Sequence, residues 1–491
     1  MAKVFILIRR SLFNVLAVLC LCAGTTTARA DDNPAGQSER PNVLFIIADD
    51  LGARLGCYGE PGAVSPNLDR LAKRGVLFER CYAQRPTCGP SRMSMLSGLY
   101  PYQSGLHGQN NRIGASRIKA TSLPHLFRKK GYYTARVGKV FHMSISKDMG
   151  KSGADDTPAW DEFVNNTGWD TQIENINRSH TFGTRKNHGV RITYFDPPIA
   201  SEEMADGVGT QHALRIMKER HPDKTGKPLM LFMGYYRPHP PMIAPRRHWD
   251  AIEPDGIVLP EVPEDDRDDI PDSAFGLISN RSDFKSFHFI PEAVGEAYTH
   301  AYYAAIHFID GEVQKLLDGL KANGLDDNTI VVFTGDQGFH LGEHGYWHKT
   351  SSFEESFHVP LIIYDPRSAV GGTRVSGLTG LIDLYPTLCE LAGLDPEHQL
   401  SGQSLVPMLN APDHIGKPWE LTELSYGMSL RTDRFRFSKP GNGKDYMLYD
   451  LHNDPNEWTN LIGEPKWAEV EAELRSIMEP MLKQRFEESD R

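Results

Sequence analysis

The chain has 491 residues, which is too long for one small core and suggests two domains, or one large α/β domain with an appendage. Its hydrophobic content of 40% and charged content of 24% are ordinary for a globular protein. The formal net charge of −11 argues against a general nucleic-acid-binding protein, which would need a basic surface, so local cations would have to hold any anionic substrate.

The first 30 residues have the layout of a secretory signal peptide. Basic residues precede an apolar run at residues 12–23, and Ala28-Arg29-Ala30 supplies an A-x-A cleavage site. The apolar run is short for a membrane span, and a retained N-terminal anchor is the alternative. We expect residues 1–30 to be removed, which leaves a secreted or periplasmic protein without a membrane span in the mature chain.

Four cysteines follow this leader: Cys57, Cys81, Cys88 and Cys389. They are too few and too scattered for a fold built on disulfides. A bridge between Cys57 and Cys81 is one interpretation, and two buried free thiols are the other.

The first core strand is expected at residues 42–48, an almost uniformly apolar run that is typical of a buried parallel strand. It ends in Asp49 and Asp50, at the place where open α/β sheets bind their ligands. Adjacent carboxylates cost free energy unless a cation lies between them, and their oxygens suit calcium or magnesium. An aspartate helix cap with a solvated neighbour is the alternative for such a pair alone.

A strand at residues 76–82 leads to the segment Thr87-Cys88-Gly89-Pro90-Ser91-Arg92. Pro90 suits the first turn of a helix, so Cys88 is expected just before a helix N-terminus. Backbone N–H groups and the helix dipole favour negative charge there, which predicts an oxyanion site beside Cys88.

Three later strands also end in polar side chains. They are predicted at residues 132–139, 228–236 and 328–334, and they lead to Lys139 and His142, to His239, and to Asp336 and Gln337, with Lys349 a short loop beyond. Taken singly, each lysine would more often be solvated and each histidine structural. Because parallel strands end at one edge of a sheet, these side chains can converge on Cys88.

Helices are expected between these strands, and they predict a large, mostly parallel sheet flanked by helices. The predicted helices cover residues 66–74, 122–130, 207–220, 296–323 and 383–392, and a further strand covers residues 359–364. Residues 144–205 are polar and predict a long functional loop, whereas the acidic run at 264–269 predicts a solvated loop.

Beyond residue 409 the pattern changes to short strands, at residues 429–432, 435–437 and 446–451, before a helix at 466–487. We therefore expect a catalytic α/β domain at residues 31–409. A smaller C-terminal α+β subdomain, built on an antiparallel sheet, is expected at residues 410–491.

These motifs together resemble the type I sulfatases. Cys88-Gly89-Pro90-Ser91-Arg92 is similar to their C-x-P-S-R signature, whose cysteine is oxidised to formylglycine after translation. The segments 138–142, 236–241 and 335–345 are most similar to the iduronate-2-sulfatase-like branch. Two positions differ from this pattern. The branch usually has His or Asn where this chain has Gln337, and the family often has Arg where this chain has Leu99.

The resemblance implies an alkaline-phosphatase/sulfatase-like fold and a role for each site residue. A calcium ion would be bound by the formylglycine made from Cys88 together with Asp49, Asp50, Asp336 and Gln337. Arg92 would hold the formylglycine and His142 would orient the nucleophile, while the sulfate would be held by Lys139, His239 and Lys349. A formylglycine-generating or anaerobic sulfatase-maturating enzyme would be the partner that converts Cys88.

The expected function is hydrolysis of sulfate esters of a sulfated polysaccharide or oligosaccharide by a secreted sulfatase. One alternative is a phosphomonoesterase or phosphonate hydrolase of the same superfamily, because phosphoryl and sulfuryl groups are alike in shape. Another is a non-catalytic protein that binds sulfated glycans, although the combination of Cys88, Arg92, the lysines and the carboxylates argues against it.

Overall fold

The computed structural model describes residues 40–145, 147–182, 192–275 and 290–489. The chain divides into Met1–Gln37 and Ser38–Arg491, and the expected leader lies in the first part, outside the described residues. Among the described residues, no helix combines the length and the hydrophobicity that a membrane span requires.

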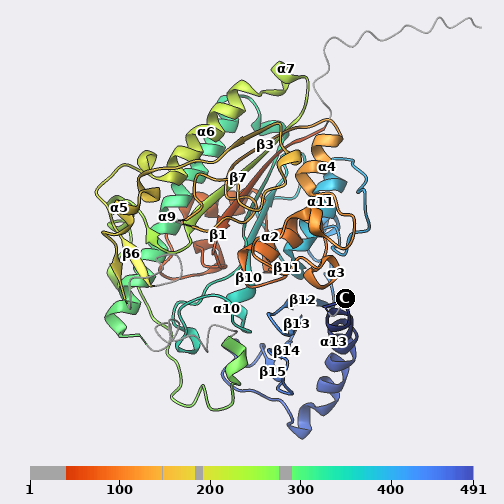
Figure 1. Ribbon diagram of the computed structural model, residues 1–491. Helices are drawn as coiled ribbons and strands as arrows, with labels where there is room; N and C mark the ends of the chain where they lie inside the picture. The colour runs from red at the N-terminus through yellow and green to blue at the C-terminus, as the bar shows by residue number, and fades with distance from the viewer. Residues whose placement is uncertain (1–39, 146, 183–191, 276–289, 490–491) are drawn as a thin grey trace, which may run out of the picture. The chain divides into compact units, whose positions relative to one another are not determined.

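An eight-stranded sheet runs through the Ser38–Arg491 part, in the order β11-β2-β10-β9-β1-β7-β3-β4 (Figure 1). Its strands are β1 (Asn42–Asp49), β2 (Val76–Tyr82), β3 (Tyr133–Gly138), β4 (Glu162–Val164), β7 (Leu229–Pro238), β9 (Thr329–Gly335), β10 (His358–Tyr364) and β11 (Thr373–Gly380). Neighbouring strands are parallel except at β10, which is antiparallel to both β9 and β2. The expected large, mostly parallel sheet is confirmed.

Helices cover both faces of this sheet (Figure 1). Leu44 and Ile46 of β1 enter one hydrophobic core, and Val43, Phe45 and Ile47 enter the other. The first core is shared with α1 (Pro66–Arg74), α6 (Ala205–Glu219) and α9 (Glu292–Ala322), and the second with α2 (Cys88–Ser97), α4 (Leu123–Lys129) and α11 (Leu384–Leu391). Because both faces are buried, the strand is apolar throughout rather than alternating.

The polar stretch at residues 144–205 is less irregular than the sequence predicts. It supplies the edge strand β4, and its strands β5 (His180–Thr181) and β6 (Thr193–Phe195) join β8 (Met242–Ile243) in a three-stranded sheet. Strands of two or three residues are too short for a hydrophobic period, so the sequence pattern missed them. The remaining short helices are α3 (Pro101–Ser104), α5 (Ile173–Ile176), α7 (Pro222–Thr225), α8 (Arg246–Trp249), α10 (Glu354–Phe357) and α12 (Val406–Asn410).

The C-terminal part forms the expected antiparallel sheet, in the order β12-β13-β14-β15. Its strands are β12 (Trp419–Glu423), β13 (Met428–Thr432), β14 (Phe435–Lys439) and β15 (Met447–Asp450), followed by α13 (Ala468–Ser489). Leu474 and Met478 of α13 share one core with Leu430 and Phe437 of the sheet. The domain boundary at residue 409 stays a prediction.

The four cysteines of the described residues are free thiols, so Cys57 and Cys81 do not form a disulfide. Burial and the neighbouring Asp69 carboxylate raise the pKa of Cys57 to about 12. Burial also raises the pKa of Cys81. Both thiols are therefore protonated at neutral pH; Cys81 is buried and Cys57 is partly buried.

Gly234 allows the backbones of β3 and β7 to approach closely where the two strands end. It pairs with Gly138, and its carbonyl oxygen accepts the N–H of Lys139 at 2.9 Å. A Cβ added at position 234 would lie 2.0 Å from the carbonyl oxygen of Lys139. Only glycine at this position allows the backbone of Lys139 to pack this closely against β7.

We expect Gly234→Ala to lower the free energy of unfolding by about 1–3 kcal/mol, because the new methyl group overlaps a backbone that cannot yield. Gly311→Ala is the matched control, since a Cβ at this position in α9 meets no heavy atom within 4 Å. That control should raise the free energy of unfolding by about 0.5–1 kcal/mol through helix propensity. Urea denaturation measures both, and equal midpoints for the two variants would contradict the close approach.

Candidate active site

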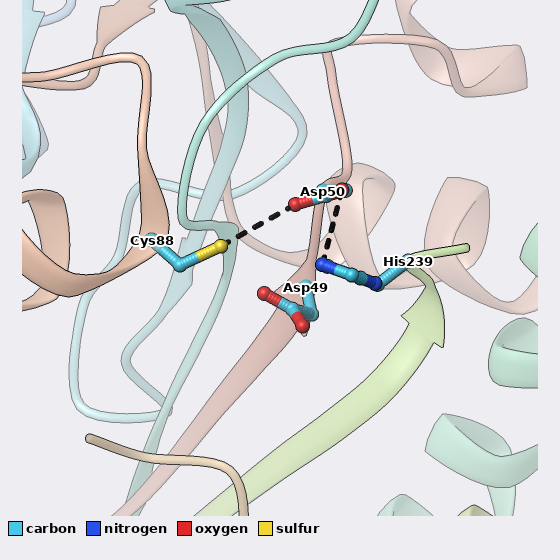
Figure 2. Close-up of side chains that lie close together, drawn as sticks. All are labelled: Asp49, Asp50, Cys88 and His239. Carbon is cyan, nitrogen blue, oxygen red and sulfur yellow. Dashed lines mark hydrogen bonds and ion pairs between the residues drawn. The ribbon is translucent and has the colours of Figure 1, made fainter. Parts of the chain in front are cut away.

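Four strand ends and one helix start supply the site. Asp49 ends β1 and Asp50 follows it, Lys139 follows β3, His239 follows β7, and Asp336 follows β9. Because β1, β3, β7 and β9 are parallel, their carboxyl ends lie at one edge of the sheet. Figure 2 shows Asp50 between the thiol of Cys88 and the imidazole of His239, with Asp49 below them.

Cys88 is the first residue of α2, whereas the sequence predicts it just before the helix. Its side chain is 1% exposed. Its Sγ lies 3.0 Å from Nζ of Lys349 and 3.6 Å from Oδ1 of Asp50 and from Nε2 of Gln337. Burial and the carboxylate of Asp49 raise the pKa of the thiol well above its ordinary value. An unmodified Cys88 is therefore protonated and a poor nucleophile.

Asp49 is fully buried between two cations. Its Oδ1 accepts a hydrogen bond of 3.2 Å from Nη2 of Arg92, and its Oδ2 accepts one from Nζ of Lys139. Burial by itself would raise the pKa of Asp49, but the charges of Lys139 and Arg92 outweigh it and lower the pKa. Asp49 is therefore ionised.

Asp50 differs from Asp49 in its backbone conformation and in the direction in which its pKa is shifted. Its backbone adopts the left-handed region, with φ of 63°, and its N–H donates to Oδ1 of Asp336 at 2.9 Å. Lys349 and Gln337 donate to Oδ1 of Asp50, while Oδ2 lies 3.7 Å from Nε2 of His239. Burial and the nearby Asp49 and Asp336 raise the pKa of Asp50 to about 7, against the opposing charge of Lys349.

Arg92 joins the helix to the strand ends. Its Nε donates to Oδ2 of Asp336 at 2.7 Å, and its Nη1 donates to the carbonyl oxygens of Lys139 and Val140. Ser91 donates to the carbonyl oxygen of Asp336, a contact that the sequence interpretation did not assign although Ser91 belongs to the cysteine motif. Gln109 accepts the N–H of Gly89 at 2.6 Å, and no sequence signal pointed to it.

His239 and His142 are both neutral. Burial and the charges of Lys349 and Lys139 lower the pKa of His239 well below its ordinary value, and its Nδ1 lies 2.6 Å from the carbonyl oxygen of Pro240. Burial and the charges of Lys139 and Arg92 lower the pKa of His142 to about 2. Among the described residues, His142 makes no hydrogen bond to the other predicted site residues, and its buried Nδ1 has no partner.

The residues present fit a hard cation. Oδ2 of Asp50 and Oε1 of Gln337 are buried oxygens without a hydrogen-bond partner among the described residues. One such unsatisfied acceptor costs about 1–3 kcal/mol. Ligand atoms of Asp49, Asp50, Cys88 and His239 lie within 4.8 Å of one another. Carboxylate and amide oxygens in this arrangement suit calcium or magnesium.

The arrangement can also bind a small anion. Lys349 lies directly beside Cys88, Lys139 and Arg92 lie behind Asp49, and the N-terminus of α2 adds the positive end of its dipole. A tetrahedral anion beside position 88 would meet Lys349 and would be attracted electrostatically by Lys139 and Arg92.

Comparisons with known proteins agree with this geometry. The sulfatase family model matches residues 41–394, and the model for the C-terminal part of N-sulphoglucosamine sulphohydrolase matches residues 342–484. A sulfatase of Formosa agariphila is 28% identical, with 92% of this chain and 89% of that protein covered. The iduronate 2-sulfatase of Mus musculus is 31% identical, with 86% of this chain and 85% of that protein covered.

Among solved structures, a phosphonate monoester hydrolase of Agrobacterium radiobacter superposes with a TM-score of 0.76 at 23% identity, and 91% of this chain and 96% of that chain are covered. At this identity the likeness shows the fold alone, and the expected alkaline-phosphatase/sulfatase-like fold is confirmed. Because the sulfatase model matches well over half of the sequence, the chain belongs to the sulfatase family and is a sulfuric ester hydrolase.

Proposed function

We propose that this sulfatase hydrolyses sulfate esters of a sulfated polysaccharide or its oligosaccharides, with a formylglycine made from Cys88 and one calcium ion. The observation that carries the proposal is the position of Cys88, whose Sγ lies at the start of α2, 3.0 Å from Nζ of Lys349 and 3.6 Å from Oδ1 of Asp50. Relatives named iduronate 2-sulfatase support a glycan substrate.

The calcium ion would be held by Asp49, Asp50, Asp336 and Gln337, together with the modified residue at position 88. When bound, the ion would lower the pKa of the attacking hydroxyl and polarise a sulfate oxygen. Oδ2 of Asp50 and Oε1 of Gln337 support this set, because both are buried oxygens of the proposed ligands and neither has a hydrogen-bond partner among the described residues.

Hydrated formylglycine at position 88 would supply a geminal diol, of which one hydroxyl attacks sulfur in line and the other later releases sulfate as the aldehyde re-forms. Arg92 would hold the modified residue, and His142 would orient it. The substrate sulfate would be held by Lys139, His239 and Lys349. The proton for the departing sugar alcohol would come from Lys349, or from His239 after the negative charge of the bound sulfate has raised the pKa of this histidine.

Conversion of Cys88 needs a maturation partner, either a formylglycine-generating enzyme or an anaerobic sulfatase-maturating enzyme. Since Cys88 is 1% exposed in the folded chain, that enzyme would have to act before folding is complete. A cleavable leader at residues 1–30 would direct the enzyme out of the cytoplasm, and polysaccharide substrates are found outside it.

We expect Cys88→Ala and Cys88→Ser to lose sulfatase turnover by several orders of magnitude and to stay folded, because neither side chain can become the aldehyde. Cys389→Ala is the matched control, since it removes another buried thiol, in α11, and should retain turnover. Rates on an aryl sulfate and mass spectra of the peptide that contains position 88 are the measurements. Near-normal turnover by Cys88→Ala would refute the assignment.

Calcium removal should abolish turnover, and added calcium should restore it. Calcium should also raise the free energy of unfolding of the wild-type chain by about 2.7 kcal/mol at a free concentration of 100 times Kd. Asp50→Asn should lose most of this stabilisation, because it removes the charge of one proposed ligand. Thermal unfolding with and without calcium tests both chains, and an equal calcium-induced rise in Tm for both would rule out Asp50 as a ligand.

A desulfation screen against defined uronic-acid and hexosamine sulfates should identify the sugar. We expect turnover of at least one glycan sulfate, and a 2-sulfated uronic acid is the first substrate to test because of the iduronate 2-sulfatase relatives. Matched aryl sulfate and aryl phosphate provide the control. Faster hydrolysis of the phosphate than of every sulfate tested would instead indicate a phosphomonoesterase.

A further inference from the structure

A second set of metal-ligating side chains shares no residue with the site around Cys88. Ligand atoms of His344, Glu355 and Glu457 lie within 4.8 Å of one another. His344 lies in the connection between β9 and β10, Glu355 lies in α10, and Glu457 follows β15. We propose that these three side chains bind a divalent transition-metal cation of the zinc type.

His344 is oriented as a metal-bound histidine would be. Its side chain is fully buried, and its Nδ1 lies 3.0 Å from Oδ1 of Asp266, which is 2% exposed. With Nδ1 directed at this carboxylate, Nε2 is the ring nitrogen that remains for a cation, and this buried atom has no hydrogen-bond partner among the described residues. A carboxylate behind the imidazole is the usual support of a metal-bound histidine. The prediction that residues 264–269 form a solvated loop is therefore wrong for Asp266.

One of the two carboxylates presents an unsatisfied oxygen, because Oε2 of Glu355 is buried and has no hydrogen-bond partner among the described residues. In Glu457, Oε1 lies 2.7 Å from Nε of Arg436 and Oε2 accepts the N–H of Glu354 at 2.7 Å. Within the described ranges, Glu355 forms no ion pair. The single ion pair with Arg436 leaves Oε2 of Glu355 and Nε2 of His344 without a partner in the described part of the chain, and a cation between the three side chains would stabilise all of them.

The ligand types favour a transition metal over calcium. One imidazole nitrogen and two carboxylate oxygens form a donor set used by zinc, and three protein ligands leave a fourth position for water. The ring of Phe353 stacks on the imidazole of His344 with 3.8 Å between the ring centroids, and the ring of Trp458 packs edge-on against it with 5.0 Å between the centroids. Both rings restrict the movement of the imidazole. Of the three proposed ligands, Glu355 also lines a cavity of about 160 Å³.

The proposed ion would fasten the segment that carries Lys349. His344 precedes Lys349 by five residues and Glu355 follows it by six, so two of the three ligands bracket this lysine. Glu457 belongs to the C-terminal part of the chain, where it follows the antiparallel sheet. The ion would therefore tie the Lys349 segment to that part. Any effect on turnover rests on the function proposed above, whereas the binding itself does not.

The test measures zinc bound per chain, by elemental analysis after desalting, in the full chain carrying Cys88→Ala and with calcium present. These conditions remove the thiol at the first site, so the result does not depend on sulfatase activity. Glu355→Gln should bind no zinc. Glu390→Gln is the matched control, because Glu390 is an exposed glutamate in α11, and it should bind one zinc per chain. Asp266→Asn should weaken binding by about 10–100-fold.

Cobalt gives an independent readout. Visible absorption bands of bound Co²⁺ should appear with the parent chain and be absent with Glu355→Gln, and backbone hydrogen exchange over residues 342–357 should slow when zinc is added. If Glu355→Gln does not fold, the affinity of Asp266→Asn provides the comparison. Absence of both zinc and cobalt from the parent chain, or equal zinc binding by parent and Glu355→Gln, would overturn the proposal.

Discussion

Burial of the two carboxylates at the end of β1 is the constraint on which the rest of this structure depends. Asp49 and Asp50 are fully buried, and an unpaired buried charge costs several kcal/mol. The compensating cations are Arg92, Lys139 and Lys349, which come from a helix, a strand end and a loop. Each must be brought to β1 by the fold, so the charge balance of the site is also a condition for stable packing of these segments.

The direction of β10 decides where that loop lies. Since β10 is antiparallel to β9, it begins at the edge of the sheet where β9 ends. The connection between them therefore stays at the carboxyl edge and does not cross a face of the sheet, as it would before a parallel strand. This connection carries Gln337 and Lys349 to Cys88, and it also carries His344 and Glu355 to the second cluster. One reversed strand thus serves both groups of residues.

Residues with an uncommon backbone conformation lie at the candidate active site and at the proposed zinc cluster. The described non-glycine residues with positive φ are Asp50, His344, Thr350 and Glu457. His344 and Glu457 are members of the proposed zinc cluster, Asp50 is a carboxylate of the candidate active site, and Thr350 follows Lys349. Such conformations cost about 1–3 kcal/mol each and persist only where the surrounding contacts impose them. The two sites are therefore held by contacts strong enough to offset local strain.

The sequence by itself determined the core strands and helices, the residue types at the strand ends and the cysteine motif, because apolar runs and capping residues act over a few neighbouring positions. It did not reveal the short strands β4, β5, β6 and β12, the eight-residue edge strand β11, the reversal of β10, or the burial of Asp266 within an acidic run. Only the tertiary structure decided these features, and only it places Lys349 against Asp50 across 299 positions of the sequence. Strand order, strand direction and the burial of a polar group depend on which distant segments pack together, and a local pattern contains no information about that choice.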